Sequence, residues 1–224
     1  MERLEGREGL AEGLQLYEAT LRVLSDWPPK PVEAVFFHGR SFGDDTGLFE
    51  LVSQMYHQGI VRQVALFNNE GERVGSSIPY QANPGKTHYR LRLQEMGVGS
   101  DRILFADPGY NTRQENETFC QLAATEGWES AVIVTQPHQL LRAMLGMVKV
   151  MAETNYWMEI YTAAPRTTPW QEVVRGSQGL ESKPRLAHIK DELDRILTYQ
   201  GTGDLASLAE LFTYFEQRDK LLRQ

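Results

Sequence analysis

Hydrophobic residues recur along the chain at spacings that alternate between those of helices and those of strands. Near the N-terminus, a three-to-four-residue spacing predicts an amphipathic helix over residues 8–25, with Leu10, Leu14, Tyr17, Leu21 and Leu24 on one face. Short runs rich in valine, isoleucine and phenylalanine predict buried strands. We expect strands at 32–37, 61–67, 102–106, 131–135 and 156–162.

Helical patterns fill the segments between these strands. They predict helices at 46–58, 86–96, 112–126 and 138–152. Gly97 should end the second of these helices, because glycine accepts the left-handed conformation at the residue after a helix. The remaining connections are a long polar loop over 71–85 and a turn at 107–109.

The alternation of strands and helices is typical of a parallel sheet in an α/β fold. We therefore predict a three-layer, Rossmann-like fold with a mostly parallel sheet of about five strands and extra helices at both termini. After Pro165 the pattern weakens into a loop before two helices around 186–199 and 204–222. The domain expected is a single one over 1–224, with a core at 32–165, the N-terminal helix at 8–25 and a C-terminal helical region at 186–222.

Composition narrows the class of protein. The chain has 224 residues, 41% hydrophobic and 24% charged, which is typical of a globular protein. A net charge of −7 gives no basic patch, so we expect no nucleic-acid partner. No window approaches the roughly 18 apolar residues of a membrane span, and the glutamate-rich first twenty residues do not resemble a signal peptide. We expect a cytoplasmic protein in which Cys120, the only cysteine, packs rather than reacts.

Two polar clusters stand in front of predicted helices. The first is Asn111–Asn116, and the second runs from Thr135 to His138 at the end of a predicted strand, followed by Arg142. In open α/β sheets, ligands bind where the carboxyl ends of strands and the N-termini of helices converge. The two clusters therefore predict one polar site for a small anionic ligand.

The first cluster has two interpretations. Thr112 and Glu115 have the spacing of a capping box, in which both side chains satisfy backbone donors at a helix start. A capping box does not explain Asn111 and Asn116, and Asn116 lies one helical turn beyond Thr112. We therefore also expect a ligand role for Asn111, Glu115 and Asn116. Both interpretations can hold, because a capped helix start also attracts anions.

His138 and Arg142 are four residues apart and share a helix face. The simplest interpretation is a surface pair with little effect on stability, but its position after a strand favours the site. Arg142 would hold a phosphate or carboxylate, and His138 would transfer a proton with an unperturbed pKa of about 6.5. We expect the removal of an exposed Arg142 to cost little stability, because its charge opposes the helix dipole.

The end of the first strand adds His38, Gly39 and Arg40. Gly39 would let the backbone approach a ligand closely, and Arg40 would neutralise an anion. Asp44 and Asp45 follow, either as metal or hydroxyl ligands or, more simply, as the acidic start of helix 46–58.

Over roughly residues 32–200 the sequence resembles the SanA/YdcF/ElyC-like family of bacterial proteins. The resemblance rests on the glycine turn after the first strand and on five further features: Gly97-Val98, Asn-Thr-x-x-Glu-Asn at 111–116, the strand that follows, Thr-x-x-His-x-x-x-Arg at 135–142, and Glu192, Ile196 and Tyr199. It implies a Rossmann-like fold and an enzymatic pocket with no fixed reaction class. Two departures, the turn at 38–43 and the helix start at 85–89, fall where a ligand would be recognised.

These observations favour a small-molecule enzyme of transferase or hydrolase type that binds an anionic or nucleotide-like ligand. We expect Glu115 and His138 to be the acid/base groups, and ligand contacts from His38, Gly39, Arg40, Asn111, Thr112, Asn116, Thr135 and Arg142. The cofactor stays open, with a nucleotide-like or S-adenosyl ligand as candidates, and no metal site is predicted. The alternatives are a non-catalytic ligand-binding or regulatory module and a scaffold that works through its terminal helices.

Overall fold

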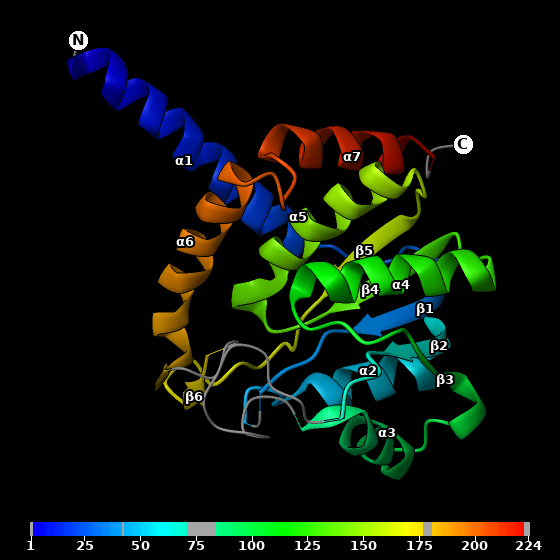
Figure 1. The fold of residues 1–224 in the computed structure, drawn as a ribbon. Coiled ribbons are helices and arrows are strands. Elements are labelled where there is room, and N and C mark those ends of the chain that lie inside the picture. Colours follow the sequence, from blue (N-terminus) through cyan, green and yellow to red (C-terminus); the bar gives the residue numbers. More distant parts are fainter. Residues whose placement is uncertain (1, 42, 71–83, 177–180, 222–224) are drawn as a thin grey trace.

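A five-stranded parallel sheet forms the centre of the protein (Figure 1). The computed structural model describes residues 2–41, 43–70, 84–176 and 181–221. The strands lie in the order β3-β2-β1-β4-β5 and every neighbouring pair is parallel. Their bounds are β1 Val32–Phe37, β2 Val61–Leu66, β3 Ile103–Phe105, β4 Ser130–Val134 and β5 Glu159–Ala163. The predicted α/β fold is confirmed.

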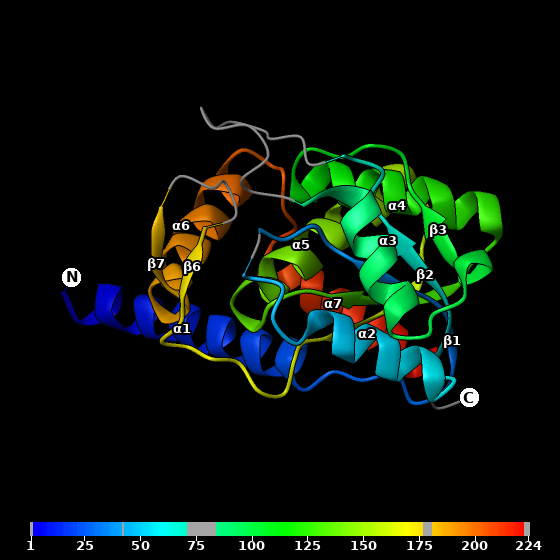
Figure 2. The same cartoon turned by 90° about the horizontal axis from the view of Figure 1, so that it is seen from below.

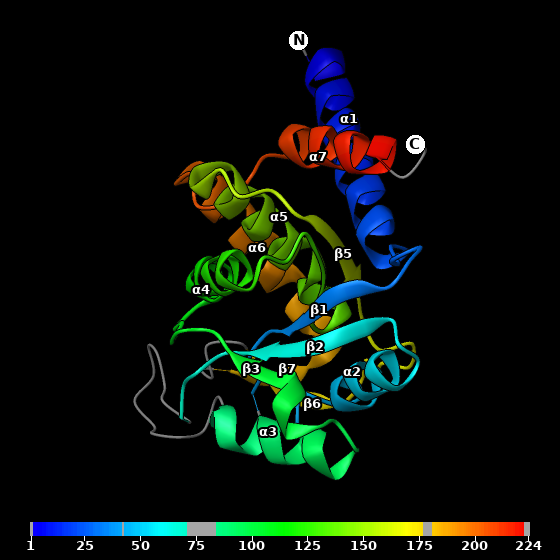
Figure 3. The same ribbon diagram turned by 90° about the vertical axis from the view of Figure 1, so that its right-hand side faces the viewer.

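Helices cover both faces of the sheet, which gives the three layers (Figure 3). On one face lie α2 and α3, and on the other α4 and α5. Two further helices, α1 and α7, pack against α5 and β5. The bounds are α1 Glu2–Leu24, α2 Leu48–His57, α3 Gly85–Glu95, α4 Thr112–Glu126, α5 Pro137–Thr154 and α7 Leu208–Leu221. Among the described residues, no helix is both long and apolar enough to cross a membrane.

Two boundaries differ from the prediction for identifiable reasons. Helix α1 begins at Glu2 instead of residue 8, because the residues from 2 to 7, apart from Gly6, are good helix formers that lack the apolar spacing. Strand β5 begins three residues late, at Glu159. Asn155, with φ +52°, ends α5 there, and Tyr156 N–H donates to the Met151 carbonyl at 3.2 Å. The residues after α5 therefore close a helix before the strand starts.

The connections around α3 were predicted in part. Gly97 has φ +86°. Its N–H donates to Gln94, and the next N–H donates to Leu93, which is the hydrogen-bond pattern of a Schellman motif. The expected helix end is confirmed.

The turn expected at 107–109 is absent from the described backbone, because Gly109 N–H donates to Asn69 Oδ1 at 3.0 Å instead. Most of the predicted loop 71–85 lies outside the described residues.

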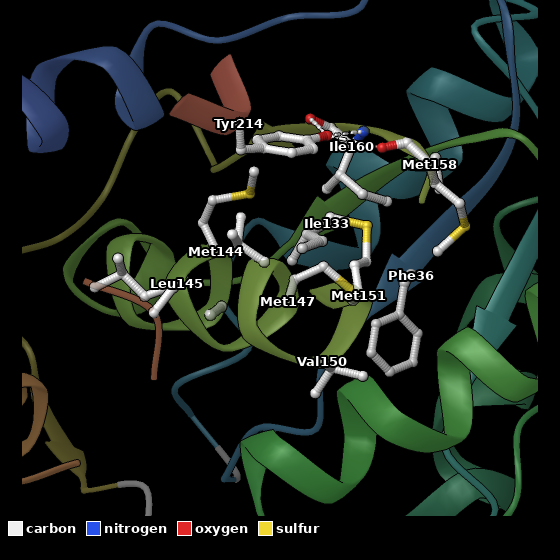
Figure 4. Packing of buried hydrophobic residues seen from close by; sticks show 14 of the residues in the cluster. Phe36, Ile133, Met144, Leu145, Met147, Val150, Met151, Met158, Ile160 and Tyr214 are labelled. Carbon is white, nitrogen blue, oxygen red and sulfur yellow. Dashed lines mark hydrogen bonds between the residues drawn. The ribbon is translucent and has the colours of Figure 1, made fainter. Parts of the chain in front are cut away.

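Successive side chains of β1 point to opposite faces and so contribute to two separate cores. Ala34 and Phe36 pack with α4 and α5, while Val35 and Phe37 pack with α2 and α3. Figure 4 shows the first core, in which the methionines of α5 lie beside Phe36, Ile133 and Ile160. The Tyr214 hydroxyl accepts from Ile160 N–H at 2.6 Å and donates to the Met158 carbonyl at 2.9 Å. These hydrogen bonds join α7 to β5 and satisfy the buried hydroxyl group of Tyr214.

The segment after Pro165, expected to be a loop, contains an antiparallel hairpin. Its strands are β6 Val173–Arg175 and β7 Ser182–Pro184, each too short to show an alternating pattern in the sequence. A 3₁₀ turn at Arg185–Ala187 leads into α6, His188–Gly201, beside the hairpin (Figure 2). Another 3₁₀ turn, Ser100–Arg102, precedes β3. The hairpin and α6 bring the C-terminal region to the carboxyl ends of the sheet, as the contacts of Arg185 and Glu192 below establish.

Candidate functional site

The candidate site lies at the carboxyl ends of β1 and β4. These strands are neighbours in the sheet, but the chain leaves them in opposite directions: β1 leads to α2 on one face, and β4 leads to α5 on the other. Such a divergence is the topological switch point at which open α/β sheets bind ligands. The predicted residues 38–40 and 135–138 follow these two strands. Asn116, in the second turn of α4, contacts His38 after β1 and the Ala143 carbonyl on α5.

His38, the first residue after β1, is buried and neutral at pH 7. Its Nε2 lies 2.8 Å from Asn116 Oδ1 on α4. Asn116 Nδ2 donates to the Ala143 carbonyl on α5 at 3.3 Å. Burial, together with the nearby charges of Arg142 and Arg40, lowers the pKa of His38 to about 4, although the hydrogen bond with Asn116 opposes the shift. Its other ring nitrogen, Nδ1, has no hydrogen-bond partner within the described part of the chain.

Glu115 is a buried carboxyl group that titrates near neutral pH. Burial raises its pKa from 4.5 to about 7, although a hydrogen bond from Gly39 N–H and the charges of Arg40 and Arg142 oppose the rise. The side chain is only 7% exposed. Its pKa near the working pH is one of the properties that a proton-transfer group needs, and the hydrogen bond from Gly39 N–H holds the carboxyl group beside the end of β1.

Arg40 was expected to hold an anion, but its guanidinium group already has partners. It donates to Asp44 and to Gln139 Oε1, and Thr135 donates to the same Gln139 oxygen at 3.2 Å. Only its Nε lacks a partner among the described residues. The simpler interpretation of Asp44, as the acidic start of a helix, is wrong. The residue is 1% exposed, and α2 begins only at Leu48.

Asp44 is instead the shared partner of two guanidinium groups. Arg185, which is fully buried, donates to Asp44 Oδ1 at 3.0 Å. Burial would raise the pKa of Asp44, but Arg40 and Arg185 hold it below its ordinary value. Arg185 also donates to the Pro169 carbonyl at 2.7 Å and to Glu172 at 3.0 Å. Nothing local in the sequence marked Arg185, because its partners lie far away along the chain.

The prediction that Arg142 is exposed is wrong. Its side chain is buried, its Nε donates to Glu192 on α6, and its Nη1 donates to the Thr112 hydroxyl at 2.8 Å. The guanidinium of Arg142 lowers the pKa of Glu192 despite the opposing effect of burial. The sequence placed Arg142 one turn into its helix correctly. It did not reveal that α6 returns to cover that turn.

The cap of α4 lies one residue earlier than the capping box predicted. Asn111 is the N-cap, and its Oδ1 accepts from Gln114 N–H at 3.0 Å. Gln114 Oε1 in turn accepts from Tyr110 N–H at 2.9 Å. The side chains of Thr112 and Glu115 therefore do not cap the helix. Thr112 accepts a hydrogen bond from Arg142, and Glu115 accepts one from Gly39 N–H. Asn111 itself is exposed at the edge of the site, with its side-chain oxygen used by the helix.

His138 does not keep the unperturbed pKa expected from the sequence. Burial, together with the charge of Arg40, lowers its pKa to about 4, so the ring is neutral at pH 7. The ring lies 6.2 Å from the His188 ring and 6.5 Å from the Trp170 ring, measured between centroids. His138 Nδ1 and Gln136 Oε1 are buried without partners among the described residues. Both atoms belong to the segment that follows β4.

The predicted residues thus come together at one end of the sheet, although several have other partners than expected. Across the described ranges, no group of three or more histidine, cysteine, aspartate or glutamate side chains could hold a metal ion. Comparison with known proteins adds no assignment, since neither a family model nor a curated protein matches the chain. What the structure establishes is an α/β fold with a five-stranded parallel sheet and a connected polar cluster at its switch point.

Proposed function

We propose that the protein is a small-molecule enzyme of transferase or hydrolase type that binds an anionic or nucleotide-like ligand at the carboxyl ends of β1 and β4. The observation that carries the proposal is Glu115, a buried carboxyl group with a pKa of about 7. A group whose pKa lies near the working pH both accepts and donates protons efficiently. Carboxyl groups perturbed in this way are enriched at functional sites.

The buried charges favour an anion. Three guanidinium groups, those of Arg40, Arg142 and Arg185, are buried around the site. Two carboxylates with lowered pKa values, Asp44 and Glu192, are their buried partners. When Glu115 carries a proton, these buried groups therefore have an excess of positive charge. The partly exposed Glu172 screens only Arg185. A bound anion would balance this excess, so we expect proton uptake by Glu115 to accompany anion binding.

The two histidines then act as neutral groups. With a pKa of about 4, His138 would offer a hydrogen bond to the ligand instead of a positive charge. This revises the role of proton carrier that its sequence position predicted, and it leaves Glu115 as the group proposed to transfer protons. The proposed ligand contacts are otherwise those of the predicted cluster, except that the Asn111 side chain caps α4.

The alternative is a non-catalytic ligand-binding or regulatory module with the same pocket. The internal pairing of Arg40 and Arg142 favours it. Each guanidinium already contacts a buried carboxylate, so an anion must compete with Asp44 or Glu192 for every donor except the unpartnered Arg40 Nε. Such competition suits a conformational switch as well as it suits catalysis.

Membership in the SanA/YdcF/ElyC-like family and a cytoplasmic location are also proposals. The first is supported by the motifs at 111–116 and 135–142 together with the parallel sheet. The second is supported by the acidic composition and by Cys120, a single buried free thiol.

A thermal-shift screen over nucleotides, S-adenosyl compounds, sugar phosphates and divalent metal ions tests the proposal. A ligand at 100 times its dissociation constant should add about 2.7 kcal/mol of stability. Each stabilising compound is then incubated with the protein and the mixture is analysed for product. Glu115→Gln should keep binding and lose turnover by roughly 10²–10⁴-fold. Glu126→Gln, an exposed change at the other end of the same helix, should alter neither.

The outcomes separate the hypotheses. Stabilisation with turnover that depends on Glu115 supports the enzyme. Stabilisation without product supports the binding module. The absence of a shift with every anion overturns both and favours the scaffold.

A further inference from the structure

We propose that Nδ1 of His38 accepts a hydrogen bond from a hydroxyl group of the ligand, and that Asn116 and the Ala143 carbonyl hold the His38 ring in the tautomer that this contact requires. The ligand part rests on the proposed function. The tautomer part does not, because it concerns the protein without a ligand.

The orientation of the Asn116 amide is fixed by its partners. This side chain is fully buried and has two partners, the Ala143 carbonyl at 3.3 Å and His38 Nε2 at 2.8 Å. A carbonyl oxygen only accepts, so the amide NH₂ must face Ala143. The amide oxygen of Asn116 therefore faces the histidine. Reversing the amide would place two oxygens against each other, so the backbone of α5 fixes this orientation.

The Asn116 orientation determines which nitrogen of His38 carries the proton. The Asn116 oxygen also only accepts, so Nε2 of His38 must carry a hydrogen and donate it. A neutral imidazole has one such hydrogen, and Nδ1 is then left with a lone pair. Burial and the guanidinium groups of Arg142 and Arg40 keep the ring neutral, with a pKa of about 4. Glu115, the titrating neighbour, contacts Gly39 N–H and not the ring.

Close packing holds the His38 ring and the Asn116 amide in place. On the Nε2 side, α4 and α5 approach closely at Gly146, where an added Cβ would lie 2.9 Å from Asn116 Nδ2. The His38 ring lies 4.6 Å from the Phe36 ring, which stacks on Phe119 at 4.4 Å. Neighbouring side chains therefore restrict rotation of the ring, and Nδ1 keeps its direction. A buried acceptor that has no partner costs free energy, which a ligand donor would recover.

Two of the four buried atoms that lack a partner among the described residues also indicate the ligand's chemistry. His38 Nδ1 is an acceptor, and Nε of Arg40, two residues further along the same strand exit, is a donor. A ligand that satisfies both has a hydroxyl group and an anionic oxygen, as in a sugar phosphate. A pKa of about 4 makes Nδ1 a hydrogen-bond acceptor and not a base that retains a proton at pH 7. His38 would orient the ligand hydroxyl, while Glu115 exchanges the proton.

The tautomer can be measured in the free protein by two-bond ¹H–¹⁵N correlation spectra of its five histidines at pH 7. The signals of His38 are those lost in His38→Gln. We expect a pyridine-type Nδ1 and a pyrrole-type Nε2. The opposite tautomer, or a charged ring at pH 7, would overturn the inference. Asn116→Leu removes the acceptor of the His38 Nε2 proton and should give mixed tautomers. Gln121→Leu, an exposed change on the same helix, should not. The wild-type spectrum decides even if Asn116→Leu fails to fold.

The ligand class is tested with ribose 5-phosphate and inorganic phosphate by calorimetric titration. We expect ribose 5-phosphate to bind more tightly than phosphate. His38→Phe should lower the affinity for ribose 5-phosphate about fivefold and leave the affinity for phosphate unchanged. Equal affinities, or no binding of either, would overturn the assigned ligand class. Failure of the proposed function is seen separately, since binding with the expected tautomer but without turnover contradicts only catalysis.

Discussion

Replacing Arg142 with methionine should destabilise the protein strongly. Methionine has a similar length but no charge, so it leaves Glu192, which is 2% exposed, without its main partner. It also removes the hydrogen bond that Arg142 donates to the Thr112 hydroxyl. Removing one partner of a buried ion pair costs about 3–5 kcal/mol. Arg195 also contacts Glu192, from a more exposed position, and offsets part of the loss. We therefore expect a cost near the lower bound, about 3 kcal/mol.

Urea denaturation at pH 7, followed by circular dichroism, measures this cost directly. In a thermal melt the same loss should lower Tm by roughly 6–12 °C for a chain of this size. Lys149→Met is the matched control on the same helix. It breaks a partly exposed pair with Glu153, which should cost at most about 1 kcal/mol. The double variant Arg142→Met/Glu192→Leu should recover most of the stability, because apolar replacement of both partners is often neutral.

The pH dependence provides a second test. The pKa of Glu192 is lower in the folded protein than its ordinary value of 4.5, so the pair stabilises the fold above that pH. The contribution is lost as the pH falls through the folded-state pKa. The difference between wild type and Arg142→Met should therefore be largest at neutral pH and should shrink in acid. A single variant within about 1 kcal/mol of wild type at pH 7, or a difference that does not change with pH, would refute the buried pair.

Three further changes probe the site and its surroundings. Glu115→Gln should be more stable than wild type by up to about 3 kcal/mol above pH 7. The gain should vanish near pH 4.5, because the folded protein holds the Glu115 proton up to a pKa of about 7. Urea titrations in which the difference between the two proteins does not shrink as the pH falls would contradict the assignment. Asn111→Ala should cost about 1 kcal/mol through loss of the Gln114 N–H contact, and an unchanged melt would show that this cap is unimportant. Cys120 should resist thiol reagents in the native state, because burial raises its thiol pKa to about 12, and rapid labelling of the folded protein would count against its burial.

The strands and helices of the core could be predicted because each has a periodicity within a short window. The strand β1 and the helix α4 begin and end at the residues expected from the sequence. The cap could not be chosen in the same way. Asn111 with Gln114, and Thr112 with Glu115, are overlapping patterns of the same spacing, and only the packing of α4 selects the first.

The electrostatics of the site were the least predictable part. The sequence identified Arg40 and Arg142 as cations at strand ends, but their burial depends on distant segments. Arg142 meets Glu192 across 50 positions, and Asp44 meets Arg185 across 141. No local pattern encodes such contacts. The pKa values of His38, His138 and Glu115 follow from the same burial, so their departures from ordinary values could not be anticipated either.

These long-range pairs change what counts as a module in this chain. The segment after Pro165 supplies Arg185 to Asp44 and Glu192 to Arg142, so it provides counter-ions to the part that contains all five strands of the main sheet. A chimera that exchanged residues 32–165 alone between related proteins would combine cations and carboxylates that had not evolved together. Among relatives, the residues at positions 44 and 185, and at 142 and 192, should therefore change in concert. The polar cluster at the strand ends and the segment after Pro165 should therefore be inherited together, and recombination breakpoints near residue 165 should be disfavoured.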